Sequence, residues 1–111
     1  MATNKSVTVI GGGSFGTTIA YLLSANHEEV KLWLRDEAIV NSINTQHENP
    51  VYAPGKSLPS HILATSNMES AIADSSLIFV SIPSKAFRKV ATEIGRYVKG
   101  DQILITTTKG F

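Results

Sequence analysis

The chain has no cysteine among its 111 residues. This absence excludes disulfide bonds, thiolate nucleophiles and cysteine-ligated metal sites, and it leaves the cellular compartment open, with the cytoplasm as the default expectation. The three histidines, His27, His47 and His61, do not have the spacing of metal ligands. We therefore expect no metal centre.

Strong net charge and long apolar runs are also missing. The formal net charge is +1, so bulk electrostatics give no attraction to nucleic acid or to a membrane surface, and any anion site must be local. No apolar run approaches the length of a membrane span, and the first residues lack the basic-then-apolar pattern of a signal peptide. A content of 42% apolar and 17% charged residues is typical of one compact, soluble domain.

The most informative stretch is a glycine turn near the start of the chain. Residues 7–10 are apolar or β-branched and predict a buried strand, while residues 17–23 continue as a helix. Between them, Gly11, Gly13 and Gly16 have the G-x-G-x-x-G spacing of a dinucleotide site. The first glycine permits a tight turn, the second lets a pyrophosphate approach the backbone, and the third lets the helix pack closely on the strand. The alternative is a tight turn that binds nothing.

The remaining sequence alternates apolar strand patterns with helical ones. We predict further strands at residues 30–34, 62–65, 77–82 and 102–106. The most apolar of these runs, residues 77–82, is typical of a central strand covered on both faces. The alternation predicts an α/β fold with a doubly wound parallel sheet in the strand order 3-2-1-4-5.

Capping residues and turn formers mark the predicted helices. Asp36 is expected to cap one helix, Ser66 and Glu69 to form a capping box for the next, and Ser84 to cap the last, which Gly100 ends. Between residues 47 and 60, three prolines and a glycine predict a loop that is unusually long for a compact α/β unit, and such loops are often functional.

In a sheet of this kind, ligands bind at the carboxyl ends of the strands, where the strand order reverses. Arg35 stands at the end of the second strand, where NAD enzymes usually have a carboxylate that accepts from the ribose 2′-hydroxyl. A guanidinium instead matches a 2′-phosphate, so we expect NADPH to be preferred and NADH still accepted. The alternative is a solvated arginine. Asp36 fits a helix cap better than a ribose acceptor, because it lies one residue late.

Lysines and arginines elsewhere carry weaker signals. Lys109 follows the fifth strand on the same edge, where an ammonium could meet a phosphate, although a solvent-exposed lysine is the alternative. Lys85, Arg88 and Lys89 form a basic patch that we interpret as the solvent-exposed side of a helix. No nucleophile-elbow or P-loop lysine pattern is present.

Several stretches together resemble one enzyme family. Residues 9–17, V-I-G-G-G-S-F-G-T, are similar to the V-I-G-A-G-S-[aromatic]-G-T opening of bacterial-type NAD(P)-dependent glycerol-3-phosphate dehydrogenases. The ends of the second and fourth strands also match. Residues 49–59 resemble the family's N-x-x-Y-L-P-G-x-x-L-P loop, and residues 108–111, T-K-G-F, match its more specific T-K-G motif. Gly12 and Ala53 replace the family's alanine and leucine.

The resemblance implies that the chain is the N-terminal, Rossmann-type NAD(P)-binding domain, residues 1–111, truncated after the fifth strand. The full enzyme would interconvert dihydroxyacetone phosphate and sn-glycerol 3-phosphate for glycerophospholipid synthesis, with NADP or NAD as cofactor and as a homo-oligomer. The family's helical domain and its catalytic lysine would be absent, so the fragment would hold no catalytic residue and be inactive. Lys109 would also contact substrate. The implied cofactor contacts are Gly11, Gly13, Ser14, Phe15, Gly16, Arg35, Tyr52 and Lys109.

Two other functions stay open at this point. One is a different hydroxyacid or imine reductase with a similar glycine opening. The other is a regulatory module that senses NAD(P) without chemistry, although such a module would not need the T-K-G motif.

Overall fold

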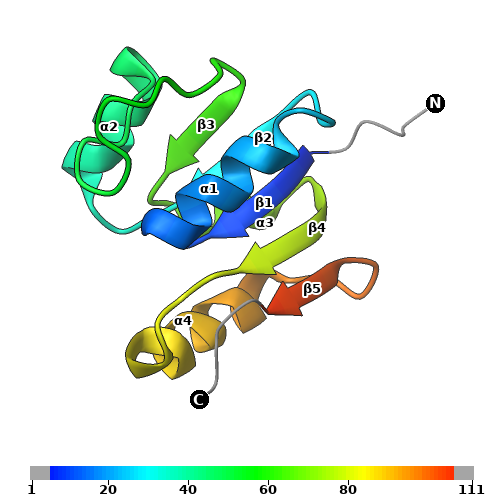
Figure 1. Cartoon of the computed structure of the whole chain (residues 1–111). Coiled ribbons are helices and arrows are strands. Elements are labelled where there is room, and N and C mark those ends of the chain that lie inside the picture. The colour runs from blue at the N-terminus through cyan, green and yellow to red at the C-terminus, as the bar shows by residue number, and fades with distance from the viewer. Residues whose placement is uncertain (1–5, 107–111) are drawn as a thin grey trace.

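A computed structural model describes residues 6–106 of the chain. Its core is one sheet of five parallel strands in the order β3-β2-β1-β4-β5 (Figure 1). The predicted α/β fold and strand order are therefore confirmed. The strands are β1 (Ser6–Ile10), β2 (Val30–Trp33), β3 (Ile62–Thr65), β4 (Ser75–Val80) and β5 (Ile103–Thr106).

Four helices cover the two faces of the sheet. Because alternate strand residues point to opposite faces, each strand supplies two separate apolar layers. Val7 and Val9 of β1 pack on the side of α1 and α2, whereas Ile78 and Val80 of β4 pack on the side of α3 and α4. The helices are α1 (Ser14–Leu23), α2 (Glu37–Gln46), α3 (Met68–Ile72) and α4 (Ser84–Tyr97).

Coverage of the sheet falls from its centre toward β5. All five residues of β1 are buried. In β4, the prediction of cover on both faces is only partly right: Leu77 and Phe79 stay partly exposed, because α1 lies over β1 and β2 rather than over β4 (Figure 1). Every residue of β5 is exposed, and three of them are large and apolar, Ile103, Leu104 and Ile105.

Asp36 caps α2 as predicted, and its Oδ1 accepts a hydrogen bond of 2.9 Å from the Ala38 N–H. Residues 47–60 form a loop as predicted, and α2 ends where His47 adopts a left-handed backbone conformation (φ 57°). The fourth strand begins and ends two residues earlier than the predicted range of 77–82.

Two other predicted caps are wrong. The cap of α3 is Asn67, whose side chain accepts from the Ser70 N–H, while the Ser66 hydroxyl is bound to Glu37 instead. The residue before α4 is Pro83, and no side chain caps that helix, which begins at Ser84.

The end of α4 also differs from the prediction. The helix ends at Tyr97, before Gly100, because Val98 takes an extended backbone conformation. In the part of the chain that the structure describes, none of the helices combines the length and the hydrophobicity needed to cross a bilayer.

Candidate functional site

A cavity of about 820 Å³ opens at the carboxyl ends of β1, β2 and β4. Three of the four predicted loops meet there: the glycine turn, the end of β2, and residues 81–84 after β4. Lys109, in the fourth loop, lies outside the described residues. The other seven predicted site residues all line the cavity: Gly11, Gly13, Ser14, Phe15, Gly16, Arg35 and Tyr52.

Two of the glycines allow close contacts between backbone segments, one between the turn and the residue after β4 and one within the turn. Gly11 has a φ of 120°, and a Cβ built on it would lie 2.0 Å from the carbonyl oxygen of Ser81. A Cβ on Gly16 would lie 1.9 Å from the carbonyl oxygen of Gly11. Both separations are far below any real contact, so the turn closes only with glycine at these positions.

Gly13 has the opposite environment. A Cβ built on it meets no protein atom within 4 Å, although the residue lines the cavity. Its backbone is extended (φ −72°, ψ −173°), and no side chain caps α1, which begins at the next residue. The first N–H groups of a helix have no partner within the helix and carry its positive end. The turn therefore offers donors and open space together, the combination that suits a phosphate.

Asn49 holds this turn in place, a role that was not predicted from the sequence. Its side chain is fully buried, and its Nδ2 donates to the Gly12 carbonyl oxygen at 3.0 Å and to Thr17 Oγ1 at 3.1 Å. Its Oδ1 accepts from the N–H groups of Val51 and Tyr52. The Asn49 carboxamide thus joins the glycine turn to the loop of residues 47–60, which carries Tyr52.

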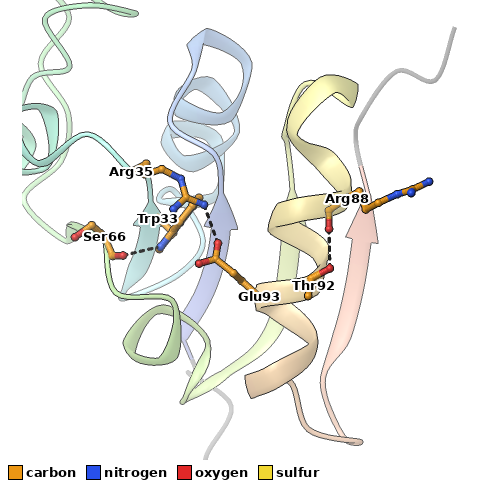
Figure 2. A network of polar contacts seen from close by, with 6 residues as sticks. All are labelled: Trp33, Arg35, Ser66, Arg88, Thr92 and Glu93. Atoms are coloured by element: carbon orange, nitrogen blue, oxygen red, sulfur yellow. Dashed lines mark hydrogen bonds and ion pairs between the residues drawn. The ribbon is translucent and has the colours of Figure 1, made fainter.

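The guanidinium of Arg35 is anchored from two sides (Figure 2). Its Nη2 lies 2.7 Å from Oε1 of Glu93 on α4, and its Cζ lies 5.1 Å from the ring centre of Trp33. The Trp33 ring is itself held by a hydrogen bond from Nε1 to the carbonyl oxygen of Ser66. Arg35 is exposed, in agreement with the alternative of a solvated arginine, and its contacts with Glu93 and Trp33 place it at the edge of the cavity.

Among residues 6–106, Arg35 is the basic residue that lines the cavity. Lys85, Arg88 and Lys89 are exposed on α4, in agreement with their interpretation as a solvent-facing patch. Figure 2 shows the Arg88 side chain pointing away from Arg35. Within residues 6–106, no three His, Asp or Glu side chains gather closely enough to hold a metal ion.

Comparisons with known proteins agree with this geometry. The chain is 42% identical over 105 residues to a glycerol-3-phosphate dehydrogenase [NAD(P)+] of Alcanivorax borkumensis, a match that covers 95% of the chain and 31% of the relative. Among solved structures, the fold matches glycerol-3-phosphate dehydrogenase from Saccharomyces cerevisiae with a TM-score of 0.90 at 28% identity, over 98% of this chain and 35% of that one. The enzyme from Plasmodium falciparum matches with a TM-score of 0.88 at 30% identity, over 96% and 33% of the two chains.

The chain therefore spans about a third of the length of these relatives. A family model described as the N-terminus of NAD-dependent glycerol-3-phosphate dehydrogenase matches residues 6–111. With almost the whole chain matched, and with the glycine turn and strand order that a dinucleotide fold needs, the chain belongs to the family of NAD-dependent glycerol-3-phosphate dehydrogenase N-terminal domains.

Proposed function

We propose that the chain is the NAD(P)-binding N-terminal domain of an enzyme that interconverts dihydroxyacetone phosphate and sn-glycerol 3-phosphate. The observation that carries the proposal is the open space over Gly13 at the uncapped start of α1, inside a cavity at the carboxyl ends of β1, β2 and β4. Family membership supports the choice of reaction.

In this proposal, the pyrophosphate of the cofactor rests on the first N–H groups of α1, with Gly13 and Ser14 against it. Phe15 and Tyr52 are 54% and 49% exposed where they line the cavity, so bound cofactor would cover aromatic surface that water now contacts. Gly11 and Gly16 act indirectly, because they hold the turn closed. From the family resemblance, Lys109 contacts both cofactor and substrate.

Arg35 is the basis for proposing that NADPH is preferred. Its guanidinium follows β2 at the edge of the cavity, and the only carboxylate next to it in sequence, Asp36, is bound to N–H groups of α2. Asp36 therefore acts as the cap of α2 through its Oδ1. An arginine in this place supplies charge-assisted hydrogen bonds to a 2′-phosphate, and NADH should still bind through the glycine turn.

When bound, the nicotinamide cofactor supplies the hydride donor or acceptor, and the residues of this chain position it and neutralise its phosphates. The proton-transferring lysine of the family would come from a helical domain that follows in the whole enzyme. The proposal includes a cytoplasmic, homo-oligomeric enzyme that supplies glycerol 3-phosphate for glycerophospholipid synthesis.

The test is oxidation of NADPH by the full-length enzyme with dihydroxyacetone phosphate, followed by the loss of absorbance and by identification of the product. We expect saturable oxidation and sn-glycerol 3-phosphate as product. Turnover only with 2-oxo acids or imines would identify the protein as a different reductase. Tight NADPH binding without turnover of any carbonyl compound would identify it as a sensing module. Either result would overturn the proposal.

A further inference from the structure

One acidic side chain lies against the group that we assign to the 2′-phosphate. Glu93 is on the third turn of α4, far in sequence from Arg35, yet its Oε1 lies 2.7 Å from Arg35 Nη2 (Figure 2). Its side chain is 33% exposed, against 58% for Arg35, so the carboxylate lies on the less solvated side of the pair. Glu93 does not line the cavity, and its link to the cavity is the ion pair with Arg35.

A guanidinium has five N–H donors, and one direction of this fork is taken by Glu93. The Trp33 ring lies 5.1 Å from Arg35 Cζ, and this contact limits how far the guanidinium can turn away. A 2′-phosphate on the remaining donors would lie on the order of 5–7 Å from the carboxylate, since each charge-assisted bond is about 2.8 Å long. Two anions would then share one cation.

We propose that Glu93 is a specificity-determining residue that acts through Arg35 and limits the preference for NADPH over NADH. Its negative charge repels the 2′-phosphate and leaves NADH, which has no charge there, unaffected. The inference rests on the proposed role of Arg35 in NADPH binding. It explains how a chain with arginine after β2 can still serve both cofactors.

The size of the effect follows from Coulomb's law. At this separation and in a largely aqueous setting, repulsion between a carboxylate and a phosphate changes the affinity by about three- to tenfold. An exposed ion pair contributes little to holding Arg35 in place. The gain in NADPH affinity from removing the negative charge should therefore exceed any loss of affinity caused by greater mobility of Arg35. Glutamine at position 93 keeps the size of the side chain and an oxygen that can accept from Nη2, while it removes the charge.

The experiment uses Glu93→Gln in the full-length enzyme, with Kd for NADPH and for NADH measured by titration. We expect the Kd for NADPH to fall by about three- to tenfold, the Kd for NADH to stay within twofold, and the difference to shrink at high salt. Asp101→Asn is the matched control. It removes the same charge from an exposed residue before β5, at the amino ends of the strands and away from the cavity, and should change neither affinity.

Unchanged or weaker NADPH binding in Glu93→Gln would overturn the inference, and so would an equal gain for both cofactors. Arg35→Ala, measured in parallel, separates this failure from failure of the proposed function. If Arg35→Ala weakens NADPH selectively while Glu93→Gln has no effect, only the role of Glu93 is wrong. If Arg35→Ala weakens both cofactors equally, the assignment of Arg35 to the 2′-phosphate is wrong as well.

Discussion

Replacing Gly13 with valine should greatly weaken cofactor binding and leave the fold intact. A Cβ at this position meets no protein atom within 4 Å, and the local backbone is extended, which valine adopts freely. Valine is a poorer helix cap than glycine, at a cost of up to about 1 kcal/mol. The reduced freedom of the unfolded chain offsets this by about 0.4–1 kcal/mol. The free energy of unfolding should therefore change by no more than about 1 kcal/mol.

The effect on binding is much larger, because the valine side chain occupies the space in which we place the pyrophosphate. Loss of two charge-assisted hydrogen bonds from α1 costs roughly 3–6 kcal/mol, at about 1.5–3 kcal/mol each. The Kd for NADH and for NADPH should rise by more than about a hundredfold. Titration of the folded, full-length variant with each cofactor measures this directly, and thermal unfolding reports the stability.

Gly95→Ala is the matched control, since its Cβ also meets nothing within 4 Å, but it lies on the exposed side of α4. It should leave both affinities unchanged and stabilise the helix by about 1 kcal/mol. A folded Gly13→Val variant with the original affinity would refute the assignment of the glycine turn.

Three further changes test other parts of the site. Arg35→Ala should reduce kcat/KM with NADPH by about ten- to a hundredfold, as expected for one charge-assisted bond, and largely spare NADH. Arg88→Ala, which removes the same charge from a side chain that points away, should change neither value. Asn49→Ala leaves buried polar groups without a partner and should lower the free energy of unfolding by about 2–4 kcal/mol, with similar losses of NADH and NADPH affinity; an unchanged melting temperature would contradict its anchoring role. Residues 1–111 alone should show no oxidation of NADPH with dihydroxyacetone phosphate, because the family's proton-transferring lysine is expected elsewhere, and measurable turnover would refute this.

The parts of the structure that were predictable from sequence depend on local patterns. The alternation of strands and helices with right-handed crossovers predicts a doubly wound parallel sheet, and the glycine turn after the first strand favours the order 3-2-1-4-5. Asp36 was recognisable as a cap because its partners, the N–H groups of Ala38 and Ile39, are two and three residues away. The glycine spacing similarly describes one continuous turn.

What sequence reasoning missed depends on contacts between distant residues. Ser66 fits the capping-box pattern, but its hydroxyl binds Glu37 across the fold, and the adjacent Asn67 caps α3. Asn49 binds Gly12 and Thr17, which are 37 and 32 positions away. Glu93 meets Arg35 over a separation of 58 positions. No local pattern marks such partners, although asparagine at the start of a proline-rich loop is a residue type that often holds a turn.

The central claim is that the glycine turn of this chain binds the phosphates of a nicotinamide cofactor. A crystal structure of the full-length enzyme with NADPH tests it most directly. The account predicts pyrophosphate oxygens within about 3 Å of the backbone nitrogens at the start of α1, in the space over Gly13, with the 2′-phosphate on Arg35. A nucleotide bound elsewhere, with that space left empty, would contradict it.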